Sequence, residues 1–375
     1  MQFIDFKADA KLHHDDYLKA YERVLSSGWY ILGSEVESFE REFAEYLGVK
    51  HVIGVGNGLD ALHISLMALG IGVGDEVITT PLSAVATTLA IISVGAKPIF
   101  VDINRDGQID ATQIEAKITP STKAILPVHL YGNACDITSI LQIAKKHNLQ
   151  VIEDAAQAHG SSYNGQQLGT FGKLGCFSFY PTKNLGTIGG DAGAVVTNDG
   201  DLALILRQLR NYGEASKYNS VRFGVNSRLD EFHAAILRAK LTWLENSNSR
   251  KRAIAQYYYN HLSDIPELQL ISPLPNSIPN IHQFVVTTPR RSELQKQLLT
   301  AGIPSLIHYP VPIHKQLFLV DQYPKLSLPN AEHFCKTTLS LPSHEFLTSD
   351  ELNQVITAIH SFKNMSTTFD NKRLY

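Results

Sequence analysis

The segment "CFSFYPTKNLGTIGG", residues 176–190, joins an apolar run to a glycine-rich loop, with a lysine between them. The run Cys176–Tyr180 is typical of a buried strand. The glycines between Gly186 and Gly193 let the backbone approach a neighbouring group closely. A lysine at such a strand end is either a solvated surface charge, which is the common case, or a nucleophile held over a pocket. The rest of the chain has to decide between these two roles for Lys183.

Upstream of this segment, residues 50–155 alternate between apolar runs and segments with helical spacing. This alternation is typical of an α/β fold with a largely parallel sheet. The strand-like runs are "KHVIGVG" (50–56), "DEVITT" (75–80), "KPIFVDI" (97–103), "KAILPVHLYG" (123–132) and "LQVIEDAA" (149–156).

The helix after the first run is predicted from four leucines at positions 59, 62, 66 and 69, with Gly70 at its end. Leucines at three- and four-residue intervals lie on one face of a helix, and glycine ends helices. Similar spacing predicts helices over "SILQIAKKH" (139–147), "DLALILRQLR" (201–210) and "DEFHAAILRAKLTWL" (230–244).

The chain has 375 residues, 44% hydrophobic and 18% charged, which is enough to bury a large core. Because single cores stop growing near ~250 residues, we expect two domains. After Trp243 the sequence becomes polar and then proline-rich, as in "ISPLPNSIPN" and "HYPVPIH". We therefore predict a large domain over residues 1–245 and a smaller one over 246–375.

Composition and charge exclude several classes of function. The net charge of -3 and the scattered basic residues give no surface for nucleic acid or an anionic membrane. Cys135, Cys176 and Cys335 lack metal or redox spacing and favour a reducing cytoplasm. The start "MQFIDFKADAKLHHDD" carries charges where a signal peptide needs an apolar core, and "AVATTLAIISVGA" is too short to span a bilayer. We expect a cytoplasmic protein.

Ligands of open α/β sheets bind at the carboxyl ends of the strands, and "GVGNGLDAL" (54–62) is one such place. Gly56, Asn57 and Gly58 lead into a helix whose free N–H groups and dipole would hold a phosphate. A plain strand-to-helix turn explains the string equally well.

The same string also imitates a dinucleotide-binding fingerprint. Its glycines alternate from Gly54 to Gly58, and acidic residues follow about 20 positions later at Asp75 and Glu76. This favours a nicotinamide oxidoreductase as a competing enzyme class. The leucines at 59 and 62 weaken it, because the fingerprint's last glycine, which lets helix and strand pack closely, is missing.

A second strand end is "VIEDAAQAHG" (151–160). Asp154 ends an apolar run, where an unpaired carboxylate is costly, so a cationic partner is expected. It is either the N-cap of a following helix or a carboxylate that keeps a pyridine nitrogen protonated, as a pyridoxal ring requires. Gln157 lies three residues on, and His159 is as consistent with a structural as with a catalytic histidine.

The third strand end is the opening segment. A lysine amine forms a Schiff base with an aldehyde cofactor and reacts better where desolvation lowers its pKa. Ser178 offers a hydroxyl to a phosphate or is a half-buried strand residue. A phosphate cup, a strand-end aspartate and a strand-end lysine in this order are far more specific together than singly.

With these segments, the chain resembles the DegT/DnrJ/StrS family of pyridoxal phosphate-dependent nucleotide-sugar aminotransferases. The resemblance covers nearly the whole length and implies the fold type I, aspartate aminotransferase-like architecture, a homodimer with shared active sites, and L-glutamate as amino donor. Its markers here are "GVGNGLDAL", "PVHLYG", "VIEDAAQAHG", "FSFYPTKNLG", "GVNSRLDEFHAAIL" and "IHYPVPIHKQ".

The resemblance implies roles for individual residues. Lys183 matches the Schiff-base lysine, Asp154 the carboxylate facing the pyridinium nitrogen, and Gln157 the residue near the ring hydroxyl. Asn57, Gly58 and Ser178 match the phosphate cup, and Asn226 matches the asparagine that reaches the phosphate from the neighbouring subunit. The nucleotide diphosphate position is matched by Lys217, Tyr218 and Arg228, for which an exposed basic surface is an equal alternative. The candidates for the sugar pocket are Trp29, Tyr30, Tyr131, His308, Tyr309 and His314, each of which also fits a packing role.

Two positions depart from the family pattern. Members usually place an aromatic side chain over the cofactor ring, where this chain has Val85. The loop "GTIGGDAGAVV" is also one residue longer than the common pattern, so Gly189 to Gly193 need not overlay on the family's loop.

The resemblance implies that the chain aminates a keto carbon of a nucleotide sugar in deoxyaminosugar or polysaccharide biosynthesis. The string "NSRLDE" is more similar to members that act on dTDP-linked 3-keto-6-deoxyhexoses, because members acting at the 4-position more often have tyrosine in place of Ser227. A 4-keto sugar or aminocyclitol acceptor stays open. A nicotinamide enzyme leaves Lys183 unexplained, and a non-catalytic regulatory protein on this fold commonly lacks that lysine.

Overall fold

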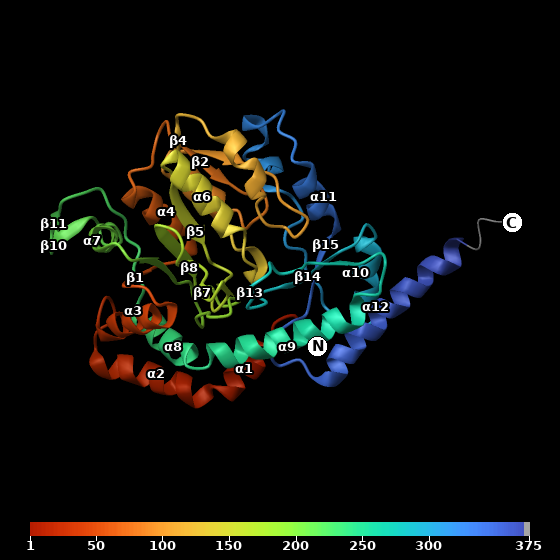
Figure 1. Ribbon diagram of the computed structural model, residues 1–375. Helices are drawn as coiled ribbons and strands as arrows, with labels where there is room; N and C mark the ends of the chain where they lie inside the picture. Colours follow the sequence, from red (N-terminus) through yellow and green to blue (C-terminus); the bar gives the residue numbers. More distant parts are fainter. Residues whose placement is uncertain (371–375) are drawn as a thin grey trace.

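The structure is a computed structural model that describes the backbone of residues 1–370 and the side chains of residues 1–362. Figure 1 shows a sheet-centred body with a small hairpin projecting at one end. A long helix, α9 (Leu244–Leu262), runs along the bottom of the body and leads toward the C-terminal elements on the side opposite the hairpin.

The body is built on a seven-stranded sheet of order β1-β9-β8-β5-β4-β2-β3. Strand β9 runs antiparallel to both of its neighbours, and the pairs from β8 to β3 are all parallel. The prediction of an α/β fold with a mostly parallel sheet is confirmed. The strands are β1 His51–Val55, β2 Glu76–Thr79, β3 Lys97–Phe100, β4 Thr122–Leu126, β5 Gln150–Asp154, β8 Leu174–Ser178 and β9 Gly193–Thr197.

Both faces of this sheet are buried, because successive side chains along a strand point to opposite faces. In β4, Ala124 and Leu126 join the cluster under α4, α5 and α7, whereas Ile125 joins the cluster under α6. Helices α3 and α8 cover the remaining part of the second face. The bounds are α3 Ser34–Leu47, α4 Gly58–Ala68, α5 Ala86–Ser93, α6 Ile137–His147, α7 Gly200–Leu209 and α8 Glu231–Leu241.

The predicted helices begin at side chains that cap them. Asn57 Oδ1 accepts a hydrogen bond of 2.8 Å from Asp60 N at the start of α4, and Gly70 follows that helix at φ +69°. Aspartates cap α6, α7 and α8 in the same way, at positions 136, 199 and 230. The four helices predicted from the spacing of apolar residues are therefore confirmed, to within a few residues at their ends.

The C-terminal part has a hydrophobic cluster of its own, formed by residues between Ile254 and Phe362. Its three-stranded sheet has the order β12-β14-β15. We propose that this part is the small domain predicted over residues 246–375, of which 371–375 lie outside the described residues. Its elements are α9, β12 Gln269–Leu270, β14 Phe284–Thr287, α10 Arg291–Thr300, α11 Pro329–Thr337, β15 Thr338–Leu341 and α12 Ser349–Asp370.

The remaining elements are short or lie at the surface. No helix within residues 1–370 combines the length and apolar character that crossing a bilayer requires. The helices are α1 Phe6–Leu12 and α2 His14–Ser27; the strands are β6 Ser162–Tyr163, β7 Gln166–Gln167, β10 Glu214–Ser216, β11 Asn219–Ser220 and β13 Ser277–Ile278; the 3-10 segments are 111–113, 115–117, 130–132, 313–315 and 320–322.

Candidate functional site

The predicted aspartate and lysine lie at the ends of two neighbouring parallel strands. Asp154 is the last residue of β5, which pairs with β8 so that Asp154 lies opposite Cys176. Lys183 lies on the loop that leaves β8, and its amide donates to Tyr180 O at 2.8 Å. Carboxyl ends of parallel strands meet at one edge of a sheet, where ligands of α/β proteins bind. The fold thus brings a carboxylate and an amine to the same place.

Asp154 is buried, with 4% of its surface exposed. Its Oδ2 accepts from Thr87 Oγ1 at 2.8 Å and its Oδ1 accepts from Ala156 N at 3.1 Å. Burial raises the pKa of this carboxyl, while the two hydrogen bonds and the charge of Lys183 act against that rise. No helix follows directly, so the N-cap interpretation was wrong: the carboxylate closes a turn instead.

Thr87 contacts the candidate site through Asp154, and the sequence analysis missed it. It lies on α5, where it is fully buried and where its hydroxyl also lies 2.9 Å from Ser83 Oγ. The only signal in the sequence was the pair Thr87 and Thr88 in an otherwise apolar helix. Such a pair does not predict which strand end the hydroxyls contact.

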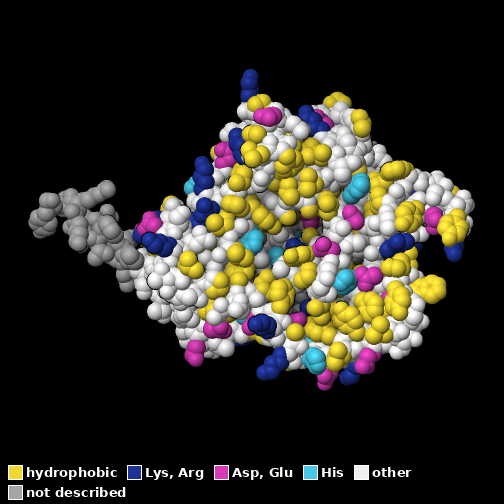
Figure 2. All heavy atoms as spheres, turned by 180° about the vertical axis from the view of Figure 1, so that it is seen from behind, with side chains coloured by type: hydrophobic (Ala, Val, Ile, Leu, Met, Phe, Trp, Pro, Cys, Tyr) yellow, Lys and Arg dark blue, Asp and Glu magenta, His cyan; other side chains and the backbone are white. Residues whose placement is uncertain are grey.

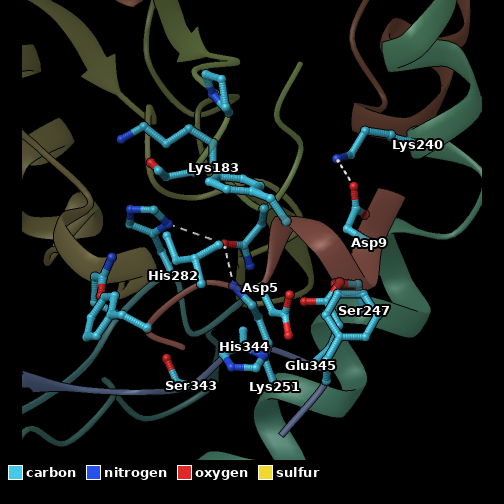
Figure 3. A pocket seen from close by; sticks show the side chains of 18 of the residues that line it. Asp5, Asp9, Lys183, Lys240, Ser247, Lys251, His282, Ser343, His344 and Glu345 are labelled. Atoms are coloured by element: carbon cyan, nitrogen blue, oxygen red, sulfur yellow. Dashed lines mark hydrogen bonds and ion pairs between the residues drawn. The ribbon is translucent and has the colours of Figure 1, made fainter. Parts of the chain in front are cut away.

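The Lys183 amine is free. Among the described residues its Nζ has no hydrogen bond or ion pair, although the side chain is half-buried at the wall of a cavity (Figure 3). Burial lowers the pKa of Lys183 to about 8, and the Asp154 charge acts in the opposite direction. A solvated surface charge does not fit this position, whereas a nucleophile or base does.

We expect the apoprotein to show this lowered pKa directly. Trace acetylation at pH 6 to 11, read by mass spectrometry of the peptide containing Lys183, should give a midpoint near 8. Ordinary lysines titrate near about 10.4 and serve as internal controls in the same digest. The amine loses its proton at a lower pH because burial disfavours the ammonium form. A midpoint above 10 would show that the amine is solvated.

The residues of the predicted phosphate cup lie together at the start of α4. The first N–H groups of a helix have no partner within it, and Asn57 precedes them as the cap. A Cβ at Gly58 would lie 2.5 Å from Ser178 Cβ, and a Cβ at Gly193 would lie 2.4 Å from Asn57 O. Only glycine at these positions lets α4, β8 and β9 approach this closely.

Gln157 contacts two of the predicted sugar-pocket residues, and a third is bonded to one of these two. Its Oε1 accepts from Tyr131 N at 2.6 Å, and its Nε2 donates to the Tyr309 hydroxyl at 3.2 Å. The Tyr131 hydroxyl donates to His308 O. Burial and the Lys183 charge lower the pKa of His308 to about 4, so this ring is neutral at physiological pH. Gln157, Tyr131, His308 and Tyr309 therefore form one cluster beside the Asp154 strand end.

His159 occupies a structural position. Its ring lies 5.4 Å from that of Phe177 and 5.5 Å from that of Phe179, measured between centroids. Burial first, and the Lys183 charge second, lower its pKa to about 3.

Other predicted residues are not joined to this cluster within one chain. His314 is buried against Phe100, and its Nε2 lies 3.2 Å from Glu332 Oε1. Among residues 1–362, no hydrogen bond, ion pair or ring contact connects His314, or any of the candidates named in the next sentence, to Lys183. The other unconnected candidates are Trp29 and Tyr30 between α2 and α3, Lys217 and Tyr218 on the β10–β11 hairpin, and Asn226 and Arg228 after it.

The residues near Asn226 are tied to the α4 start. Ser227 is buried, accepts from Gly56 N at 2.9 Å and donates to Asp60 Oδ2 at 2.6 Å. Asn226 itself is exposed. Arg228 Nη1 donates to Asn211 Oδ1 at 3.0 Å. The loop that carries Asn226 is thus fixed in position while the Asn226 side chain projects outward.

The two departures from the family pattern have defined positions. Val85 immediately precedes α5 and is 38% exposed, so an aliphatic side chain stands two residues from Thr87. Gly189 has φ +82° and no atom near its Cβ position, which gives the longer loop room at this point.

Comparisons with known proteins match this architecture. The model of the DegT/DnrJ/EryC1/StrS aminotransferase family matches residues 12–360. The chain is 44% identical over 362 residues to a dTDP-3-amino-3,4,6-trideoxy-alpha-D-glucose transaminase of Streptomyces venezuelae, covering 96% of this chain and 95% of that protein. It is 46% identical to a dTDP-3-amino-3,6-dideoxy-alpha-D-galactopyranose transaminase of Aneurinibacillus thermoaerophilus, with 96% and 99% covered. The crystal structure of S. venezuelae DesV with a ketimine intermediate superposes with a TM-score of 0.94 at 44% identity, covering 96% and 98%.

Proposed function

The chain belongs to the DegT/DnrJ/EryC1/StrS aminotransferase family, and on that premise we propose that it moves an amino group from L-glutamate to a dTDP-linked 3-keto-6-deoxyhexose. The observation that carries the proposal is the free Lys183 amine beside the buried Asp154 carboxylate, at the ends of adjacent parallel strands. The pair supplies the amine and the carboxylate that amino transfer needs, and the family to which the chain belongs consists of aminotransferases. The nicotinamide oxidoreductase alternative is therefore wrong.

We propose pyridoxal 5'-phosphate as the cofactor, and the residues present fit it. The α4 start with Asn57, Gly58 and Ser178 suits a phosphate because a helix N-terminus with no side chain in the way binds anions. Asp154 suits the ring nitrogen, and Gln157 the ring hydroxyl. The chemistry that the group supplies when bound is an electron sink for the substrate carbon.

The chain's own contribution is proton handling at Lys183 Nζ. With a pKa of about 8, a substantial fraction of this amine is neutral near pH 7.5, so it can accept a proton and return it. Burial raises the pKa of Asp154, and the hydrogen bonds from Thr87 and the Ala156 amide oppose that rise by favouring its ionised form. The carboxylate in turn favours a protonated partner opposite it.

For the acceptor, we propose the 3-keto over the 4-keto sugar. Ser227 is held on both sides by Gly56 and Asp60 and is 3% exposed. A tyrosine, which members acting at the 4-position more often have here, would displace this loop. Both relatives described above are named as 3-amino-sugar transaminases.

The experiment is a visible titration of purified protein with pyridoxal phosphate, then L-glutamate, then a dTDP-linked 3-keto or 4-keto 6-deoxyhexose. We expect glutamate to bleach the protein-bound band and only the 3-keto sugar to restore it. A band that never forms would contradict the cofactor assignment. Restoration by the 4-keto sugar alone would keep amino transfer and overturn the choice of carbon.

A glycine substitution tests the phosphate cup. Gly58→Ala should weaken pyridoxal phosphate binding by at least about tenfold, equivalent to about 1.4 kcal/mol, because its Cβ would overlap Ser178. The measurement is the dissociation constant by fluorescence titration. Gly200→Ala is the matched control: it is also the first residue of a helix behind an N-cap, but its nearest contact is 3.7 Å away. Equal affinity of both variants would place the phosphate elsewhere.

We also propose a homodimer in the cytoplasm. Figure 2 shows hydrophobic side chains gathered over much of one face, around a hollow. Patches of this kind mark interfaces, and the most exposed large side chains near the hairpin are Tyr218 and Phe223, at 87% and 86%. The exposed Asn226 would then serve a neighbouring subunit.

The three cysteines are free thiols, which suits a reducing compartment.

A further inference from the structure

A cavity of about 60 Å³ lies behind the Lys183 loop, between the N-terminal segment, α9 and residues 343–346. Figure 3 shows Lys183 at one wall of this cavity, with His282 close by and Lys251, His344 and Glu345 at the far side. Lys183 does not use this side of the loop for chemistry, because its functional partner is Asp154. The residues that line the cavity therefore contact the Lys183 loop on the side away from Asp154, where they can hold it in place.

The support is centred on Asn184, the residue after Lys183. Its Nδ2 donates to Asn248 Oδ1 at 2.7 Å and to Asn280 O at 2.9 Å. Its Oδ1 accepts from Lys251 Nζ at 3.2 Å and from His282 Nδ1 at 3.3 Å, drawn as dashed lines in Figure 3. A side-chain amide has two N–H donors and two acceptor positions. All four are used, so the orientation of Asn184 is fixed.

The same network reaches the Gln157 segment. Asn248 Nδ2 donates to His159 O at 2.9 Å, and Asn280 Nδ2 donates to Gln157 O and His159 O, both at 3.0 Å. Asn184 therefore ties the lysine loop to the segment that follows Asp154, through one residue of α9 and one that precedes β14.

Lys251 is the charged member of this network, and burying its charge costs free energy of folding. It lies on α9 with 8% of its surface exposed, and burial lowers its pKa. The nearby carboxylate is Glu345, which accepts from Ser247 Oγ at 2.8 Å. A buried ammonium adds little to the stability of the folded protein, because a protein with a hydrophobic side chain of similar size in its place is often equally stable. Its presence needs a reason other than folding, and its contact with Asn184 supplies one.

We propose that Lys251 and Asn184 are positioning residues that hold the Lys183 backbone so that the amine faces Asp154. This deepens the proposed function and rests on it. Lys251 acts through Asn184, since it donates to Asn184 Oδ1 and, among the described residues, has no hydrogen bond or ion pair with the Lys183 side chain.

The test compares Lys251→Met with Lys240→Met in the full-length protein. Both lysines line the cavity, but Lys240 pairs with Asp9 at 3.6 Å and does not contact Asn184. A misplacement of about 1 Å costs about 100-fold in rate, so we expect kcat of Lys251→Met to fall between 10- and 100-fold with KM within twofold. Lys240→Met should keep the wild-type kcat.

A second readout needs neither cofactor nor turnover. Acetylation of Lys183 in apoprotein should show its midpoint raised toward the ordinary value in Lys251→Met, because a loosened side chain becomes better solvated. The other groups that face Lys183 are Asp154, His159, His282 and His308. Burial keeps the three histidines neutral above pH 7, so they do not titrate in this range.

A double-mutant cycle with Asn184→Ala separates positioning from general structure. If Lys251 acts through Asn184, the double variant loses no more activity than Asn184→Ala alone. Additive losses, or an unshifted midpoint in Lys251→Met, would overturn the proposal. Where Lys251→Met does not fold, Lys251→Gln takes its place in the same cycle. If the wild type shows no amino transfer, the proposed function fails, while the midpoints still decide whether Lys251 positions Lys183.

Discussion

Lys183→Ala is expected to abolish amino transfer, with turnover reduced by about 10⁴-fold, the upper end of the range for loss of a positioned acid–base group. The reason lies in the Lys183 amine. Among the described residues its Nζ has no hydrogen bond or ion pair, and burial beside the Asp154 strand end lowers its pKa to about 8. The measurement is glutamate-dependent amination of the dTDP-linked 3-keto sugar. Lys173→Ala is the control, because Lys173 is 43% exposed in its side chain and pairs with Asp199 at 2.7 Å.

The same variant separates an enzyme from a non-catalytic cofactor-binding protein. Lys183→Ala leaves Asn57, Gly58 and Ser178 in place, so it should still bind pyridoxal phosphate without covalent capture after borohydride reduction. If the wild type also binds the cofactor without turning over any keto sugar, the regulatory alternative gains support. Retained turnover in Lys183→Ala would remove the central assignment altogether.

The sequence was sufficient to predict what depends on local pattern. Alternating runs predicted the sheet, because the strands are buried on both faces and read as apolar segments. Strand ends located Asp154 and Lys183, because in a parallel sheet all carboxyl ends lie at one edge. Asn57 and Gly58 were found because a cap and a close approach demand particular residue types.

What the sequence did not predict depends on contacts between distant segments. The hydroxyl of Thr87 meets Asp154 across 67 positions, and no local pattern encodes that distance. Asn184 and Lys251 are likewise 67 positions apart and belong to different elements. The N-cap interpretation of Asp154 was wrong because the carboxylate closes a turn with Ala156, and a turn and a cap share the same residue preference.

Glu153→Gln is expected to cause the largest loss of stability, although Glu153 does no chemistry in the proposed reaction. Its carboxylate is fully buried next to Asp154 and accepts four hydrogen bonds. Phe171 N and Gly172 N donate to Oε1 at 2.7 and 2.6 Å. Gly169 N donates to Oε2, as does the His129 Nε2–H, both at 2.9 Å.

Glutamine preserves the shape but replaces one oxygen by an NH₂ group, so two of the four donors face another donor. An unsatisfied buried donor costs about 1–3 kcal/mol, which gives a loss of about 2–6 kcal/mol in the free energy of unfolding. The tautomer is fixed by the other ring nitrogen, because His129 Nδ1 accepts from Cys135 N at 3.3 Å. His129 cannot turn its Nδ1 toward the new amide without breaking that contact.

Urea denaturation followed by circular dichroism measures this loss, with Glu115→Gln as the control. Glu115 is exposed and pairs with Lys146 and His147 at the surface, so its variant should unfold at the wild-type midpoint. The loop of residues 169–172 and the His129 segment both meet β5 through Glu153, which makes this carboxylate the anchor of the strand that presents Asp154. Unchanged stability of Glu153→Gln would mean that the strand is held by its sheet partners alone.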